Sequence, residues 1–325
     1  MPTALVVGVG AAGARAARQL LSSGFRVLLT DQRSERQATV LDALGESAQA
    51  YDRDPSEVEA DVVLLCHGPG PHAPLAAALV RRGVPVVSVA DDPDDVGSLL
   101  DLDPEATERG VSLVVGAGFS PGLSCLLAAH AAALLDKVTE IHIARAGTGG
   151  PACAQRHHRA LRGLGLDWRD GGWVRRSAGS GRELCWFPDP VGGRDCYRAA
   201  LPEPLLLVRA FPGVDRITAR LAANRRDRMT ARLPMLRPPH ADGGPGATRV
   251  ELRGERRGEG TVTVVYGAME VPSMAAGAVA AAVARLVLEG GAIRPGAGGL
   301  AELFEPLPLL QALAERGIKA AAFTG

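Results

Sequence analysis

Lysine is nearly absent from this sequence. Among 325 residues only Lys137 and Lys319 are lysines, so almost all of the 36 basic side chains are arginines. A mechanism that uses a lysine amine as nucleophile or base therefore has almost no residue to carry it. The 36 acidic side chains cancel the basic ones, and a chain without net charge lacks the field that holds a polyanion or an anionic membrane. We therefore expect neither nucleic acid nor a membrane as a partner.

Paired cysteines and long apolar runs are also missing. The five cysteines are widely spaced and form no CxxC pair, a pattern typical neither of a disulfide framework nor of a structural zinc site. The N-terminus lacks the basic flank and long apolar stretch of a signal peptide, and Ala275–Leu288 is too short and too rich in alanine to span a bilayer. These absences predict reduced thiols and a cytoplasmic location.

The first 31 residues contain the most informative pattern. An apolar run, Ala4–Val7, leads into the glycine-rich sequence Gly8–Gly13; a helical pattern to Ser23 is followed by a second apolar run, 25–30, and by Asp31. This order is the fingerprint of a dinucleotide-binding βαβ unit: a strand, a glycine-rich turn, a helix, a second strand and an acid. We therefore expect a nicotinamide dinucleotide as cofactor.

Each glycine of this fingerprint meets a different physical need. Gly8 permits the tight turn, Gly10 lets a pyrophosphate approach the backbone, and Gly13 lets the helix pack closely on the strand. The following helix offers free N–H groups and partial positive charge to the phosphates at its N-terminus. The glycine-rich turn should therefore bind the cofactor's pyrophosphate.

The acid at the end of the second strand bears on the choice of cofactor. Asp31 would accept hydrogen bonds from the ribose and repel a 2′-phosphate, which favours NAD over NADP. Arg33 and Arg36 lie just beyond it and would accept that phosphate, so NADP stays open. The predicted cofactor-binding residues are Gly8, Gly10, Ala11, Ala12, Gly13, Asp31, Arg33, Cys66 and Gly68.

Alternating helical and strand patterns continue to about residue 119. Ser34 and Gln37 have the spacing of a capping box, which predicts a helix that ends at Gly45. Further strands are predicted at 61–66, 84–89 and 111–115, with a helix at 72–82 between the first two. This alternation predicts a Rossmann-type, doubly wound parallel sheet, in which ligands bind at the carboxyl ends of the strands.

The pattern changes after this point to shorter runs that look antiparallel. These predicted strands are 138–145, 183–187, 216–222, 249–253 and 261–266. Helices are predicted at 121–135 and 272–288, and two short ones at 300–316. The fold class is therefore α/β, with a second α+β domain built on a mainly antiparallel sheet. We predict a dinucleotide-binding domain at 1–121, a substrate and dimerisation domain at 122–270, and C-terminal helices at 271–325 that return to the first domain.

Three motifs resemble one enzyme family. Gly118–Ala128 resembles the G-x-D-P-G-x-x-H-x-x-A stretch of saccharopine reductases and carboxynorspermidine dehydrogenases. Gly68–Ala73 is similar to their turn after the fourth strand, and Gly147–Ala152 to their C-G-G-L-P-A-P segment. The resemblance implies an oxidoreductase that moves a hydride between a nicotinamide cofactor and a C=N or amine centre of an amino-acid-like substrate.

The sequence also departs from that family's pattern. The family's Asp before Pro-Gly is Ser120 here, its next acid is Ser124, its His is Cys125, and its preceding Asn-Glu is Val115–Gly116. Several groups that would bind an amino-dicarboxylate are therefore absent. The resemblance implies the fold and the cofactor but leaves the substrate open.

The candidate site residues follow from the needs of hydride transfer, which are a polar group that exchanges a proton and groups that orient the substrate. His157 and His158 are adjacent on a predicted helix and point about 100° apart, so at most one should face the pocket. Adjacent helical positions cannot easily supply two ligands to one ion, so we predict no metal site from Cys153, His157 and His158. Packed histidines and solvated arginines are the alternative interpretation. The candidate catalytic residues are His72, His157 and His158, and the candidate substrate-binding residues are Ser120, Gly122, Arg145, Gly149 and Arg156.

Arginines are concentrated near the second group of candidates. Residues 145–182 hold eight arginines and two acids, and guanidinium groups match carboxylates or phosphates. We therefore expect a small anionic substrate. The predicted second sheet would have one face free, and from this face we expect a homodimer. A sugar or other alcohol dehydrogenase, a double-bond reductase and a non-catalytic dinucleotide-binding sensor remain the alternatives.

Overall fold

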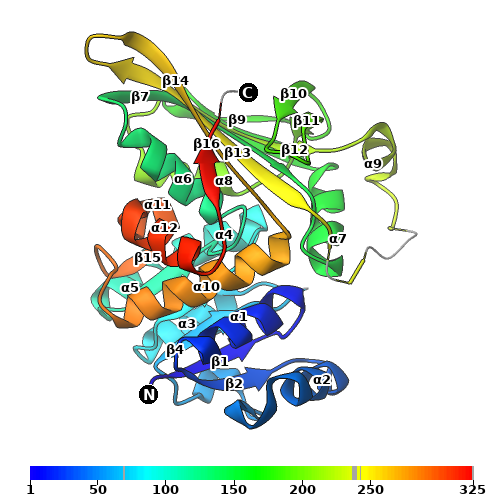
Figure 1. The fold of residues 1–325 in the computed structure, drawn as a ribbon, viewed down its shortest axis with the longest axis vertical. Helices are drawn as coiled ribbons and strands as arrows, with labels where there is room; N and C mark the ends of the chain where they lie inside the picture. Colours follow the sequence, from blue (N-terminus) through cyan, green and yellow to red (C-terminus); the bar gives the residue numbers. More distant parts are fainter. Residues whose placement is uncertain (69, 236–239, 242, 324–325) are drawn as a thin grey trace.

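A computed structural model describes residues 1–68, 70–235, 240–241 and 243–323. Pro69, which belongs to the predicted turn at 68–73, lies outside the described residues. Two sheets stand one above the other, with helices between and around them (Figure 1). Among the described residues, no helix has both the length and the apolar character that crossing a membrane requires.

The first sheet has seven strands in the order β15-β6-β5-β4-β1-β2-β3, and every neighbouring pair is parallel. The order β3-β2-β1-β4-β5-β6 is that of the dinucleotide-binding doubly wound fold. This confirms the predicted fold class. Its strands are β1 (Thr3–Val7), β2 (Arg26–Thr30), β3 (Ala48–Ala50), β4 (Val62–Leu65), β5 (Val86–Ser88), β6 (Ser112–Val115) and β15 (Gly296–Gly298).

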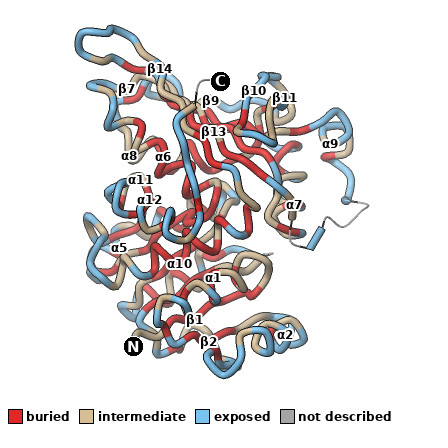
Figure 2. The backbone as a smooth tube through the Cα atoms, viewed as in Figure 1, coloured by how far each residue is buried: buried red, intermediate tan, exposed pale blue. Residues whose placement is uncertain are grey.

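Helices cover both faces of this sheet, and its strands are buried (Figure 2). They are α1 (Ala11–Ser22), α2 (Ser34–Leu44), α3 (Ala73–Arg81), α4 (Pro93–Leu100), α5 (Asp103–Glu108) and α10 (Pro272–Leu288), with short 3-10 turns at η1 (Gly45–Ser47) and η2 (Pro55–Glu57). The predicted helix at 272–288 is confirmed. Helix α10 packs directly on α1, since a Cβ on Gly277 would lie 2.6 Å from Arg15 Cβ and 2.8 Å from Ala16 N.

The predicted capping box at α2 is wrong. Arg33 is the residue that precedes the helix, and no side chain caps it within the described part of the chain. The Gln37 side chain turns inward instead and donates hydrogen bonds to Leu29 O at 3.0 Å and Asp52 Oδ1 at 3.1 Å. Gln37 is buried, so its amide satisfies polar groups beside β2 rather than the helix N-terminus.

The second sheet has nine strands in the order β10-β11-β12-β7-β13-β14-β16, with β8 and β9 attached beside β12. They are β7 (Lys137–Ala146), β8 (Leu164–Arg169), β9 (Gly172–Ser177), β10 (Glu183–Trp186), β11 (Gly193–Arg198), β12 (Arg216–Ala222), β13 (Gly246–Arg256), β14 (Gly260–Glu270) and β16 (Ala320–Ala322). The sheet is mainly antiparallel, but β7 and β12 pair in parallel. The antiparallel expectation for these two strands is wrong, because the long connection between them allows a crossover.

A layer of helices separates the two sheets. It contains α6 (Leu123–Ala132), α8 (Glu203–Ala210), α11 (Leu300–Leu303) and α12 (Pro306–Glu315), whereas α7 (Pro151–Ala160) and α9 (Arg225–Thr230) lie at the edge of the second sheet (Figure 1). The C-terminal residues add β15 to the first sheet and β16 to the second. The domain boundaries at 121 and 270 stay a prediction.

Candidate active site between the two sheets

The glycine-rich turn joins β1 to α1. Gly8 has φ +88°, a conformation that L side chains rarely adopt, and a Cβ there would overlap the backbone of His67. A Cβ on Gly13 would overlap the carbonyl oxygen of Gly8, so α1 rests directly on the end of β1. Gly10 differs from both, since a Cβ there would meet only Arg36 Nη1, at 3.9 Å. The turn is therefore closed behind Gly8 and Gly13 and open at Gly10.

The N-terminus of α1 is free to bind an anion. Gly10 precedes the helix and no side chain of the described residues caps it, so the N–H groups of the first turn point outward without helical partners. These groups and the helix dipole favour a negative group at this place. We call the parts of the protein built on the first and second sheets the first and second lobes. Ala11 and Ala12, the first two helical residues, lie against the second lobe, since a Cβ on Gly150 would lie 3.3 Å from Ala11 Cβ.

Asp31 lies beside the turn, at the end of β2. Its Oδ2 accepts a hydrogen bond from Val9 N and its Oδ1 one from Arg33 N, each at 2.8 Å. Arg36 Nη1 lies 3.6 Å from the same carboxylate. Asp31 thus fixes the backbone of the glycine turn and has one cation at its side. The open glycine, the uncapped helix and this carboxylate fit the pyrophosphate and ribose of a dinucleotide.

A crevice runs from this turn between the two lobes. Its narrow part has a volume of about 80 Å³. The residues that line it belong to α1, the loops after β5 and β6, the end of β7, and the starts of α7 and α10. A wider cavity of about 340 Å³ adjoins it and shares Val89, Asp91 and Arg156. The narrow part is lined by Ala12, Val89, Asp91, Gly118–Pro121, Arg145–Gly147, Gly149, Cys153, Arg156, His157, Pro272, Ser273 and Ala276.

A buried ion pair forms one wall of the crevice. Arg145 on β7 is 3% exposed and Glu203, the first residue of α8, is fully buried; Arg145 Nη1 lies 3.5 Å from Glu203 Oε1. Ser120 Oγ donates a hydrogen bond to the same Oε1 at 2.7 Å, and Arg145 Nη1 donates one to Ser120 O. In the described structure, Arg145 Nε and Glu203 Oε2 have no hydrogen-bond partner. Arg145 itself lines the crevice, so its positive charge would attract an anionic group there.

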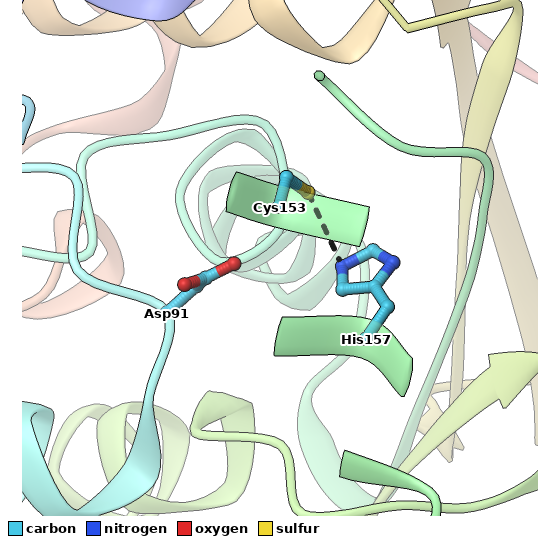
Figure 3. Close-up of side chains that lie close together, drawn as sticks. All are labelled: Asp91, Cys153 and His157. Atoms are coloured by element: carbon cyan, nitrogen blue, oxygen red, sulfur yellow. Dashed lines mark hydrogen bonds between the residues drawn. The ribbon is translucent and has the colours of Figure 1, made fainter. Parts of the chain in front are cut away.

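Helix α7 contributes Cys153, Arg156 and His157 to the lining of the crevice. Cys153 and His157 are one helical turn apart, and Cys153 Sγ lies 3.5 Å from His157 Nε2 (Figure 3). Asp91, which follows β5, points toward both of them, and the ligand atoms of the three lie within 4.8 Å of one another. Arg156 Nε forms an ion pair with Asp91 Oδ1. Burial, together with Arg145 and Arg156, holds the pKa of His157 well below its usual range, so its imidazole is neutral near pH 7.

The other two candidate histidines are engaged elsewhere. His72 is 3% exposed; its Nδ1 is bonded to Ser88 Oγ at 2.8 Å and its Nε2 to His67 O at 2.9 Å. Burial and the neighbouring His67 lower its pKa to about 3. His158 Nε2 is bonded to Leu233 O at 3.0 Å, away from the crevice. Only His157 of the adjacent pair lines the narrow crevice, which agrees with the helical geometry expected from the sequence.

The remaining predicted residues divide into those that line the crevice and those that shape it. Ser120, Gly149 and Arg156 line it. Gly122 shapes the loop after β6, because its φ is +128° and a Cβ would overlap Gly118. A Cβ on Gly68 would lie 2.8 Å from Arg156 Nη1, so this glycine makes room for the arginine.

Two more of the predicted cofactor-binding residues lie next to the glycine turn. Cys66 sits beneath Gly13, where a Cβ on the glycine would lie 3.2 Å from Cys66 Cβ, and burial raises the pKa of this thiol to about 12. Arg33 is exposed, and it contacts Asp31 through its backbone N–H.

The sequence did not indicate the roles of Asp91, Cys153 and Glu203. Asp91 follows the predicted strand at 84–89, but spacing along the chain does not show that this loop faces α7. The i, i+4 spacing of Cys153 and His157 was the one local signal of the cluster. Glu203 gave no signal, since a lone acid in an apolar helix resembles any other.

Comparisons with known proteins agree with this fold. A family model described as NADP oxidoreductase, coenzyme F420-dependent, matches residues 3–92. Saccharopine dehydrogenase (L-Glu forming) from Saccharomyces cerevisiae has a similar structure, with 14% identity, a TM-score of 0.71 and all of both chains covered. A structure described as a probable dehydrogenase from Thermotoga maritima has 13% identity, a TM-score of 0.51 and 98% of each chain covered. No curated protein sequence matches significantly. The chain thus has the fold of NAD(P)-dependent dehydrogenases.

Proposed function

We propose that this protein is an NAD(P)-dependent oxidoreductase that acts on a C=N or amine centre of a small anionic, amino-acid-like metabolite. The observation that carries the proposal is the position of the open glycine turn. The uncapped N-terminus of α1 lies at one end of a crevice whose other walls come from β7 and α7 of the second lobe. A dinucleotide held at the turn therefore has beside it a mainly apolar crevice that contains a few polar side chains.

The residues that would hold the dinucleotide belong to the first lobe. The N–H groups at the start of α1 bind the pyrophosphate, Gly10 leaves room for it, and Asp31 accepts hydrogen bonds from the ribose. When bound, the nicotinamide supplies or accepts the hydride. Val89, at the end of β5, and Ala12 form the apolar wall on that side of the crevice.

The residues that would hold the substrate come mainly from the second lobe. Arg145 lines the crevice, and a buried guanidinium binds a carboxylate strongly because water competes little there. His157, Cys153 and Asp91 line the same crevice and would contact the reacting end of the substrate. An anionic group on Arg145 would thus orient the reacting centre toward these three side chains. The predicted homodimer stays a prediction.

The position of Asp31 leads to a prediction about cofactor preference. Asp31→Ser should weaken NADH binding by about 10-fold or more, since hydrogen bonds to a charged group contribute about 1.5–3 kcal/mol. NADPH binding should change less, because the variant also removes the charge that repels a 2′-phosphate while Arg33 and Arg36 remain. Fluorescence titration with both cofactors measures the ratio. Arg36→Ala is the matched variant and should move the ratio in the opposite direction; an unchanged ratio in Asp31→Ser contradicts the assignment.

Oxidation of NADH and NADPH in the presence of 2-keto acids together with amines tests the reaction class. The proposal predicts turnover with this mixture and little or none with the 2-keto acid alone, because the acceptor of the hydride is the imine that the two form. Sugars, simple alcohols with oxidised cofactor, and enones serve as comparison substrates. Turnover confined to one of those classes would replace the proposed reaction by an alcohol dehydrogenase or a double-bond reductase, and tight cofactor binding without turnover in any class would favour a dinucleotide sensor.

A further inference from the structure

We propose that Asp91, Cys153 and His157 bind one divalent ion of the zinc class, with its open coordination position directed into the narrow crevice. All three side chains line that crevice, and they come from two segments far apart in the chain, the β5–α4 loop and helix α7 (Figure 3). The ion would therefore connect the two lobes at the candidate active site.

The positions of the sulfur and nitrogen atoms match tetrahedral coordination. A Zn–S bond of about 2.3 Å and a Zn–N bond of about 2.0–2.1 Å, at a tetrahedral angle, place the two ligand atoms about 3.6 Å apart. The distance from Cys153 Sγ to His157 Nε2 is 3.5 Å. The i, i+4 spacing puts both side chains on one face of α7, and the helix fixes this separation before any ion binds.

The Asp91 carboxylate needs only a small movement to complete the set. Its ligand oxygen lies within 4.8 Å of the sulfur and the nitrogen. A shift of roughly 1 Å, which a side-chain rotation provides, brings it to the distance of a tetrahedral ligand. Arg156 Nε contacts Oδ1 of the carboxylate, and a carboxylate oxygen has lone pairs for more than one partner. Arg156 would thus orient Asp91 from outside the coordination sphere, as hydrogen-bonded partners of ligating carboxylates do.

The charges around the three side chains permit a cation. Two guanidinium groups lie near them: Arg145 pairs with Glu203, whereas Arg156 would share the Asp91 carboxylate with the ion. Coordination requires the thiolate form of Cys153, so binding releases its proton to solvent. Asp91 and the Cys153 thiolate then contribute two negative charges and His157 none. An S, N, O donor set is suited to Zn²⁺ or Co²⁺ and not to Mg²⁺ or Ca²⁺, which prefer oxygen ligands.

Three protein ligands and one open position are typical of catalytic rather than structural zinc sites. An ion here would polarise a carbonyl or imine that enters the crevice; this role rests on the proposed function, whereas ion binding itself does not. The sequence-based prediction of no metal site considered only ligands close together in the chain, and Asp91 comes from a different segment.

Cobalt binding followed by absorption spectroscopy tests the site. The full-length protein is stripped of metal with a chelator and titrated with Co²⁺, and elemental analysis gives the stoichiometry. We expect one Co²⁺ per chain, a near-ultraviolet thiolate-to-cobalt charge-transfer band, and visible bands of tetrahedral intensity. Cys153→Ser should abolish the charge-transfer band, and Asp91→Asn should weaken Co²⁺ binding by at least about tenfold.

Matched variants control for thiols and imidazoles in general. Cys185→Ser removes another half-buried thiol and His158→Ala removes the neighbouring imidazole, which is bonded to Leu233 O; both should retain the wild-type spectrum. Circular dichroism of each variant verifies that it is folded. Absence of the band in the wild type at one equivalent of Co²⁺, or the same band in Cys153→Ser, would overturn the proposal.

The same samples are then titrated with NADH and NADPH. Dinucleotide binding without the cobalt band would overturn the metal site and leave the proposed oxidoreductase intact. A Cys153-dependent band without dinucleotide binding would support the metal site and contradict the proposed oxidoreductase.

Discussion

Gly10→Ala is expected to weaken NAD(P)H binding by about 100-fold and leave the stability of the protein unchanged. Gly10 has φ −67°, which alanine adopts readily, and the added methyl would meet nothing closer than Arg36 Nη1 at 3.9 Å. The methyl would occupy the open side of the turn, where the pyrophosphate approaches. Hydrogen bonds to a charged group contribute about 1.5–3 kcal/mol each, and each 1.4 kcal/mol is a tenfold change in affinity, so losing one or two gives this loss.

Two other glycine variants separate this effect from folding. Gly13→Ala would place a methyl against the carbonyl oxygen of Gly8, so it should lower both the melting temperature and cofactor affinity. Gly97→Ala, in the interior of α4 with no atom within 4 Å of the new Cβ, should be neutral or stabilising by up to about 1 kcal/mol and bind cofactor normally. Calorimetric titration and thermal unfolding measure both quantities. Wild-type affinity in Gly10→Ala would contradict the assigned role of the turn.

Glu203→Gln is expected to destabilise the protein by about 3–5 kcal/mol, because it leaves a buried guanidinium without its counter-charge. Arg145 and Glu203 are almost completely excluded from solvent, and their 3.5 Å contact joins β7 to α8. Glutamine retains an oxygen that accepts the hydrogen bond from Ser120, so the charge is the main change. Urea denaturation gives the difference in free energy of unfolding.

Two further variants determine whether this loss comes from the unpaired charge. The double variant Arg145→Met with Glu203→Leu should lose less stability than Glu203→Gln, since apolar pairs of similar volume often replace buried ion pairs without cost. Glu289→Gln breaks the half-exposed pair with Arg285 and should change stability by less than about 1 kcal/mol. If Glu203→Gln also destabilises the protein by less than about 1 kcal/mol, the buried pair does not stabilise the contact between β7 and α8.

Local patterns predicted the first lobe well. Residues 4–31 contain the strand, the turn, the helix and the acid within one short segment, and the reasons for Gly8 and Gly13 hold in the structure. The helix at 272–288 was equally clear, because a long apolar run ends in charge and glycine.

Such local patterns did not predict contacts between segments that are far apart in the chain. The parallel pairing of β7 with β12 depends on the crossover between them, and β15 and β16 are three-residue strands of glycine and alanine that carry no periodic signal. In the crevice, Asp91 meets Cys153 and His157 only because the carboxyl end of β5 faces α7. His72 was a candidate because it lies at the carboxyl end of the predicted sheet, but its ring nitrogens are both hydrogen-bonded inside the first lobe.

A crystal structure of the protein grown with NADH or NADPH tests the central claim most directly. The account predicts pyrophosphate oxygens within hydrogen-bond distance of the N–H groups at the start of α1, ribose hydroxyls at Asp31, and the nicotinamide in the crevice beside Val89. A dinucleotide bound elsewhere, or none bound at saturating concentration with the turn unchanged, would contradict it.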